Sequence, residues 1–265
     1  MSAVGETGLC KRIIACLDIA GGRTVKGVNF QNLRDAGDPA ELSLLYEELG
    51  ADEIVFLDIT ATNEGRKTTI DLVRRVAGRL SIPLTVGGGV STIDDVEALL
   101  AAGADKVSVN TAAVRNPALI DEIAGAFGSQ CCVVAIDARA RAVEGEASSG
   151  SYQVLIKGGR EALDLDALTW ARECVDRGAG EIMLTSWDRD GSRSGFDIEM
   201  TRAFSSLPVP VIASGGAAGA DCFVDVFKSA GADAALAASI FHYSICTVDE
   251  IKKALEKEGV PVRPC

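Results

Sequence analysis

The sequence has 265 residues and 48% hydrophobic content, so we expect one domain over residues 1–265, with residues 1–11 as an N-terminal extension. Its 38 acidic residues outnumber its 26 basic ones, and the net charge of −12 argues against a nucleic-acid surface without excluding a small phosphorylated ligand. The eight cysteines lack CxxC spacing and no apolar run reaches about 18 residues, so we expect a soluble, cytoplasmic protein without a metal site or membrane span.

Short runs rich in Val and Ile alternate along the chain with longer stretches of helical period. This alternation is typical of β/α units around a parallel sheet. Asp38 and Asn116 each precede a proline, which predicts capped helix starts after the first and fourth strands. The units predict the α/β class and a (β/α)8 TIM barrel, with strands at 12–18, 53–58, 83–86, 106–109, 133–137, 181–185, 211–213 and 234–237.

The two halves of the sequence repeat. GADKVSVNTA at Gly103 resembles GADAALAASI at Gly231, and ADEIVFLDIT at Ala51 resembles AGEIMLTSWD at Ala179 with the same spacing. Solenoid repeats are shorter, about 20–50 residues, so the pattern indicates a doubled block of four units. We therefore expect a barrel with a two-fold half-barrel repeat.

Two connections are longer than the few residues that most βα loops need. Residues 19–38 are rich in glycine and asparagine around basic positions. Residues 138–165 form an extended polar loop after the fifth strand, and SSGSYQVLIKGGR at its centre is compatible with a small hairpin. Each loop follows the first strand of its half, so both are candidates for functional loops.

Asp18 and Asp137 end the first and fifth strands, at corresponding positions of the two halves. The reacting groups of such barrels lie at the carboxyl ends of the strands. One aspartate at a strand end often only caps the next turn, but two that the repeat matches favour catalysis. His242 is the single histidine and is expected to be structural, which leaves carboxylates as the candidate acid and base.

Glycine-rich strand ends indicate phosphate binding. Residues 86–89 (VGGG) with 109–111 (VNT) form one group, and 213–216 (ASGG) with 237–239 (AAS) form its repeat. Backbone N–H groups and helix N-termini bind phosphate without a cationic side chain. The doubled group implies a ligand with a phosphate at each end. The alternative is that these glycines serve only tight turns.

Motifs that cover all the predicted strands carry a family resemblance. They include RIIACLDI, KGVNFQNLRDAGDP, DEIVFLDITA, TVGGGV, GADKVSVNTAA, AIDAR, DRDGSRSGFD, ASGGA and GADAALAASIFH. From Arg12 to about Arg263 the chain resembles the cyclase subunit of imidazole glycerol phosphate synthase, an enzyme of histidine biosynthesis. The resemblance implies a bisphosphorylated substrate, phosphoribulosyl-formimino aminoimidazole carboxamide ribotide, which is attacked by ammonia from a partner glutaminase subunit. It implies no metal or organic cofactor.

The resemblance also implies roles for individual residues. Asp18 and Asp137 match the catalytic pair, for which we expect Asp137 as base and Asp18 as acid, and Lys26 matches a catalytic lysine of the first long loop. The implied phosphate contacts are Gly89, Asn110, Thr111, Asp190, Gly191, Ser214, Gly215, Gly216 and Ser239.

The chain departs from the family pattern in three places. Where relatives usually read like Thr-His-Gly-Gly-Arg followed by Thr-Gly, this chain has Ile156-Lys157-Gly158-Gly159-Arg160 and then Leu163-Asp164. Trp187 replaces a smaller residue, and the segment GGAAGA near Ala217 is one residue longer. The departures put the contacts of the strand-5 loop with substrate in doubt.

Four predicted strands begin with a charged residue: Arg12, Glu53, Lys106 and Glu181. Two positive and two negative side chains can close a neutral ring on the face opposite the chemistry, where residues ordinarily serve stability. The resembling family has a charged ring at matching positions. The resemblance therefore implies an ammonia gate, with the glutaminase docked around Asp105 and Gln130.

Other functions stay open beside the cyclase. The sister isomerase of the same pathway shares the half-barrel repeat and the paired aspartates, although the loop KGVNFQNLRDAGDP favours the cyclase. A related barrel delivers ammonia to a sugar in surface-polysaccharide synthesis. A barrel that only binds phosphorylated metabolites or scaffolds a partner belongs to a different class, and the presence of both aspartates argues against it.

Overall fold

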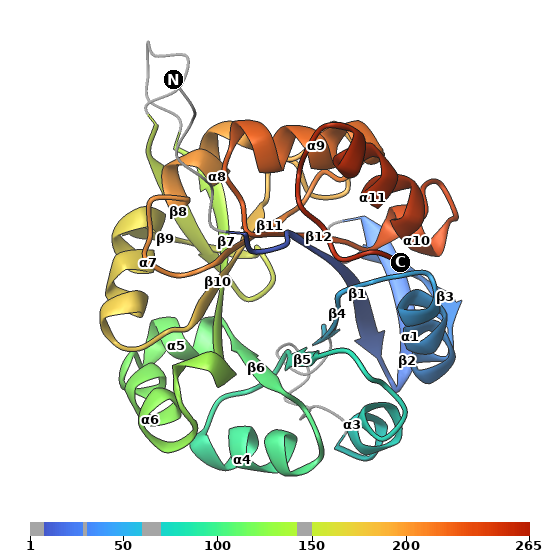
Figure 1. Cartoon of the computed structure of the whole chain (residues 1–265). Coiled ribbons are helices and arrows are strands. Elements are labelled where there is room, and N and C mark those ends of the chain that lie inside the picture. The colour runs from blue at the N-terminus through green and yellow to red at the C-terminus, as the bar shows by residue number, and fades with distance from the viewer. Residues whose placement is uncertain (1–7, 29–30, 60–69, 142–149) are drawn as a thin grey trace.

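A computed structural model shows a closed barrel of parallel strands surrounded by helices (Figure 1). It describes residues 8–28, 31–59, 70–141 and 150–265, and the side chains of residues 26–28 and 31–34 lie outside this description. The described residues contain the eight parallel strands of the predicted (β/α)8 TIM barrel, which is confirmed. These strands are β1 (Arg12–Ala20), β4 (Glu53–Asp58), β5 (Leu84–Gly87), β6 (Lys106–Val109), β7 (Cys132–Ala140), β10 (Glu181–Ser186), β11 (Val211–Ser214) and β12 (Ala234–Ala237).

The barrel strands follow one another in chain order, and a parallel pairing between β7 and β10 completes the ring. β4, β5 and β6 separate β1 from β7 on one side, and β10, β11 and β12 separate them on the other. β1 and β7, the first strands of the two halves, therefore lie on opposite sides of the barrel. Every predicted strand is present, and β1 and β7 run further than expected, to Ala20 and Ala140.

Helices cover the outside of the barrel between successive strands (Figure 1). Asp38 caps the first helix as predicted, because its Oδ1 accepts hydrogen bonds from the backbone N–H groups of Ala40 and Glu41 at 2.9 and 3.3 Å. The predicted cap at Asn116 is wrong, because Asn116 is the C-terminal cap of the short helix α5 and the next helix, α6, begins after Pro117 without a side-chain cap. The described α-helices are α1 (Pro39–Glu48), α3 (Ile70–Ala77), α4 (Ile93–Ala101), α5 (Thr111–Arg115), α6 (Ala118–Phe127), α7 (Ala167–Asp176), α8 (Ile198–Phe204), α9 (Ala220–Ser229), α10 (Ser239–His242) and α11 (Val248–Lys257).

Both long connections contain antiparallel strands. β2 (Arg23–Val28) turns back on β1 and pairs with β3 (Gln31–Gly37). In the same way β8 (Tyr152–Ile156) turns back on β7 and pairs with β9 (Glu161–Asp166), which confirms the hairpin considered for the second connection. The strands of the first connection were not predicted. Their signal was the glycine pair at the turn, Gly21 and Gly22, whose φ values of 58° and 77° suit a two-residue hairpin turn.

Alternation along the barrel strands places one row of each strand's side chains inside the barrel. On β1 this row runs from Arg12 through Ile14 and Cys16 to Asp18. Apolar side chains fill the middle of the barrel, so the polar members of these rows lie at its two ends. The central side chains are Ile14, Cys16, Val55, Val133, Met183, Ile212, Ala234 and Leu236.

Candidate active site

One cavity of about 580 Å³ opens at the carboxyl ends of the barrel strands, a size suited to a small-molecule ligand. Its lining includes Cys16, Met183 and Leu236 of the central apolar layer. The structure brings into this cavity every site residue predicted for this face except Lys26, whose side chain lies outside the description. These residues are Asp18, Gly89, Asn110, Thr111, Asp137, Asp190, Gly191, Ser214, Gly215, Gly216 and Ser239.

The two aspartates line the cavity from opposite strands. Asp18 on β1 is 3% exposed, and Asp137 on β7 is partly exposed toward the cavity. Nδ2 of Asn110 donates a hydrogen bond to Oδ2 of Asp137 at 3.1 Å. Burial raises the pKa of Asp137 to about 6, the bond from Asn110 opposes this rise, and the charge of Asp190 adds to it. A carboxylate with this pKa is suited to proton transfer near neutral pH.

The glycine-rich strand ends adopt matching conformations in the two halves. Gly88 and Gly215 have φ values of 89° and 92°. A Cβ on Gly88 would lie 2.2 Å from the backbone oxygen of Asp58, and one on Gly215 would lie 2.7 Å from that of Ser186. Close backbone packing therefore already requires glycine at both positions. Support for a phosphate site comes instead from the cavity that both groups line.

Cationic side chains at the cavity mouth were missed as site residues. Arg115 ends α5, Lys157 and Arg160 lie in the turn between β8 and β9, and Arg193 follows β10. The backbone N–H of Lys157 donates to Oγ1 of Thr111 at 3.0 Å, which fixes the turn beside the first glycine group. Only their place in the sequence could have indicated them, because all of these cations follow barrel or hairpin strands on the functional face.

Trp187 packs against the same turn. A Cβ on Gly159 would lie 2.1 Å from the indole ring, so the ring lies directly on the glycine. The backbone N–H of Trp187 donates to the carbonyl oxygen of Ala138 at 2.8 Å. Two of the departures from the family pattern, Trp187 and the turn after β8, are therefore in contact with each other.

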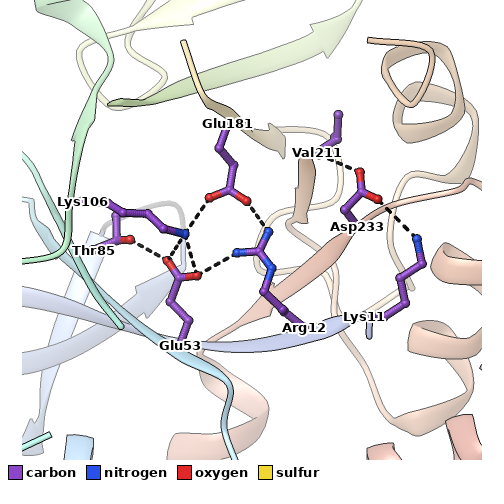
Figure 2. A network of polar contacts seen from close by, with 8 residues as sticks. All are labelled: Lys11, Arg12, Glu53, Thr85, Lys106, Glu181, Val211 and Asp233. Atoms are coloured by element: carbon purple, nitrogen blue, oxygen red, sulfur yellow. Dashed lines mark hydrogen bonds and ion pairs between the residues drawn. The ribbon is translucent and has the colours of Figure 1, made fainter. Parts of the chain in front are cut away.

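At the opposite end of the barrel, the four charged residues predicted at strand starts form a closed ring of ion pairs (Figure 2). Arg12 pairs with Glu53 at 2.8 Å and also with Glu181, and Lys106 pairs with the same two carboxylates at 3.0 and 2.9 Å. The side chains of Glu53 and Glu181 are only 1% and 7% exposed. Thr85, which was not predicted, joins the ring by donating its hydroxyl hydrogen to Oε1 of Glu53 at 2.5 Å.

His242 does not line the cavity. Its Nδ1 lies 2.6 Å from the hydroxyl oxygen of Tyr46, which supports the structural role expected for it. Among the described residues, no group of three His, Cys, Asp or Glu side chains is arranged to hold a metal ion. None of the described helices has the length and apolar character needed to cross a bilayer.

The residues able to carry chemistry gather where β/α-barrel enzymes hold their active sites, and the protein is an enzyme of that class. Residues 12–247 match the sequence model of the family described as histidine biosynthesis protein. Imidazole glycerol phosphate synthase subunit HisF of Anoxybacillus flavithermus is 58% identical over 256 residues, which cover 96% of this chain and 100% of that protein. HisF of Methanopyrus kandleri is 56% identical over 270 residues, with 97% and 99% covered. The chain belongs to the HisF family of histidine biosynthesis proteins, as its motifs indicated.

Proposed function

We propose that the protein catalyses the cyclase reaction of imidazole glycerol phosphate synthase. The observation that carries this proposal is one cavity that Asp18 and Asp137 line from opposite strands, in a chain 58% identical to a HisF subunit. The substrate is the bisphosphorylated formimino ribotide, and the products are imidazole glycerol phosphate and aminoimidazole carboxamide ribotide. The names of the relatives favour this reaction over that of the sister isomerase.

The reaction joins ammonia to the substrate in two stages. Ammonia adds to the carbon of the ribulosyl ketone, and the ketone oxygen leaves as water. The new nitrogen then attacks the formimino carbon, and the bond from this carbon to the aminoimidazole nitrogen breaks as that nitrogen takes up a proton. Loss of a proton from the ring carbon next to the former ketone carbon completes the imidazole. Each stage needs one proton taken and one given, and Asp137, with its pKa of about 6, serves as the base while Asp18 serves as the acid.

The two phosphates of the substrate bind to the two glycine groups. Gly89, Asn110 and Thr111 face one side of the cavity, and Gly216 and Ser239 face another. Backbone N–H groups in such turns hold an anion without bringing a second charge beside the aspartates. The role of Lys26 rests on the family resemblance alone. The remaining contacts of this proposal are Asp190, Gly191, Ser214 and Gly215.

The charged ring is the entrance for ammonia from a partner glutaminase subunit. Its Arg12 begins the inward row of β1 that ends at Asp18, and the apolar layer lies between ring and cavity. Neutral ammonia crosses an apolar layer at far lower cost than the ammonium ion, so this interior favours ammonia released directly by a partner. The partner docks on the ring face, where Asp105 and Gln130 are exposed.

Turnover of the formimino ribotide with an ammonium salt tests the proposed reaction. We expect formation of imidazole glycerol phosphate and the carboxamide ribotide in equal amounts. Isomerisation of the ribosyl precursor without ammonia would instead assign the isomerase function. Binding of the ribotide with no conversion of either compound would assign a binding protein.

A further inference from the structure

An arginine at the cavity mouth is held by an aromatic ring from another loop. The guanidinium carbon of Arg193 lies 5.5 Å from the centroid of the Tyr243 ring. Arg193 lines the cavity, whereas Tyr243 is 50% exposed and follows α10. A cation at this distance over an aromatic face is attracted by the ring, so the contact restrains where the guanidinium lies.

This contact connects the two sides of the second glycine group. β11 lies between β10 and β12 in the barrel, and it ends at Ser214 beside Gly215 and Gly216. Arg193 comes from the loop after β10, and Tyr243 comes from the segment after β12. The Arg193 loop is tied to the glycine group as well, because the backbone N–H of Gly195 donates to the carbonyl oxygen of Gly216 at 2.9 Å.

The backbone around the contact is unusual at both partners. Arg193 has a φ of 52°, and Ser244, next to Tyr243, has a φ of 51°; apart from Lys157, no other non-glycine residue in the described parts of the chain has a positive φ. Such conformations are costly for residues with a Cβ and concentrate at functional sites. Hydrogen bonds within the loop hold this shape, since the hydroxyls of Ser192 and Ser194 lie 2.7 Å apart.

We propose that Arg193 is the phosphate-recognising cation of the second glycine group and that Tyr243 holds its guanidinium over the end of β11. The proposal rests on the proposed function for the second phosphate site and adds a residue that determines its specificity. Backbone N–H groups accept many anions, whereas a guanidinium favours a dianionic phosphate through paired N–H donors. Arg193 thus selects a substrate end that carries a phosphate monoester over an end that carries a hydroxyl.

Glycerol 3-phosphate is a probe that tests this role without turnover. Its binding to the full chain is followed by the amide NMR shifts of Gly216 and Ser239 for the second group and of Gly89 and Thr111 for the first. In Arg193→Gln we expect the dissociation constant at the second group to rise about tenfold or more, the scale of one lost charge-assisted contact, with the first group unchanged.

Matched variants separate charge from backbone shape. Arg193→Gly accepts the positive φ without strain, so it should show the same loss as Arg193→Gln if the charge matters. Tyr243→Phe keeps the ring and should bind like the unchanged protein, whereas Tyr243→Leu should weaken the second group severalfold. Arg202→Gln is the control, because Arg202 is exposed on α8, donates to the backbone oxygen of Ser229 at 2.8 Å and does not line the cavity.

An unchanged second-group constant in Arg193→Gln would overturn the proposal. Equal weakening at both groups, or no saturable binding at the second group of the unchanged protein, would do the same. Failure of the cyclase assay, by contrast, would overturn the proposed reaction and leave the role of Arg193 to be decided by these binding constants.

Discussion

The two ends of the barrel differ in how they hold buried charge, although strands of one barrel supply both. At the lower end, Glu53 and Glu181 are nearly inaccessible to water, and each pairs with Arg12 and Lys106. At the upper end, burial raises the pKa of Asp137 to about 6, and a neighbouring carboxylate adds to that rise. The difference shows that inward orientation alone does not decide the role of a charge. The carboxylates of the ring are balanced by cations, whereas burial and the charge of Asp190 oppose ionisation of Asp137, which suits it to proton transfer.

Removing charge at the upper end tests the catalytic role of the two aspartates directly. We expect Asp137→Asn and Asp18→Asn each to reduce ammonia-dependent turnover at least about a hundredfold, the scale of a lost acid or base. Asp137→Asn should also make the fold more stable. A raised carboxyl pKa means that folding opposes ionisation, so above pH 6 the charged side chain costs stability that the amide does not, by about 1–3 kcal/mol.

Initial rates with ammonium salt and melting temperatures at pH 8 measure the two effects together. Lower activity with an equal or higher melting temperature supports a catalytic role. Near-native turnover in either variant would remove that aspartate from the mechanism.

At the lower end we expect a loss of stability, in contrast to the equal or higher stability expected at the upper end. Lys106→Ala leaves Glu53 and Glu181 with Arg12 alone, so the free energy of unfolding should fall by about 1–3 kcal/mol, less than for a fully buried pair because Lys106 is 19% exposed. If the ring is a gate, turnover with glutamine and the glutaminase should fall about tenfold, equal to about 1.4 kcal/mol of barrier. Turnover with free ammonium should change little, since ammonia then enters from the cavity mouth.

Lys11→Ala is the control for this experiment. Lys11 precedes Arg12 in the chain but pairs with the half-exposed Asp233 at 3.4 Å (Figure 2), so its loss should leave both assays unchanged. Equal losses of glutamine- and ammonium-dependent turnover in Lys106→Ala, in step with the melting temperature, would return the ring to a purely structural role.

The pH dependence of turnover tests whether Asp137 is the base. Asp137 acts as a base only when ionised, and its pKa is raised from an ordinary value near 3.8 to about 6. At a fixed concentration of free ammonia, kcat/KM should therefore fall by about tenfold per pH unit below 6, where protonation removes the base. A plateau that continues down to pH 5 would show that Asp137 is not the base.

The barrel was predictable from the sequence because alternating apolar runs and helical stretches encode each β/α unit locally. The register between neighbouring strands, which decides which residues lie side by side, was not predictable from these local patterns. Thr85 was missed as a ring member because only strand starts were considered, whereas the register places Thr85 beside Lys106. The hairpin after β1 was missed because residues 19–38 were interpreted only as a long functional loop, although a glycine pair also makes a hairpin turn.

The residues of the upper site were predictable from the sequence where they lie at the ends of barrel strands. The repeat located Asp18 and Asp137, and the family motifs located the glycine groups. The cations Lys157, Arg160 and Arg193 were missed because a turn and a loop orient them, and Arg115 was missed because it ends the short helix α5; no periodic pattern records these orientations. The contact between Trp187 and the β8–β9 turn was missed for the same reason, since it joins loops from different strands.

A change at the contact between Trp187 and the β8–β9 turn should have a smaller effect on activity. The upper site depends on loops that pack on one another, whereas the ring depends on strand positions, so a small loop change should alter substrate binding without unfolding the barrel. Gly159→Ala places a methyl group 2.1 Å from the Trp187 indole in a turn that Lys157 ties to Thr111. The turn must shift, and we expect KM for the ribotide to rise severalfold with kcat nearly unchanged, because Asp18 and Asp137 lie on barrel strands.

The double variant identifies the cause of that rise. Trp187→Ala removes the ring, so Gly159→Ala in that background retains only the strain of a positive φ, which costs about 1–2 kcal/mol for a residue with a Cβ. KM should then rise less on adding Gly159→Ala than it does in the unchanged protein, giving a coupling between the two positions. Additive effects on KM would show that the strain at Gly159, rather than its contact with Trp187, positions the turn.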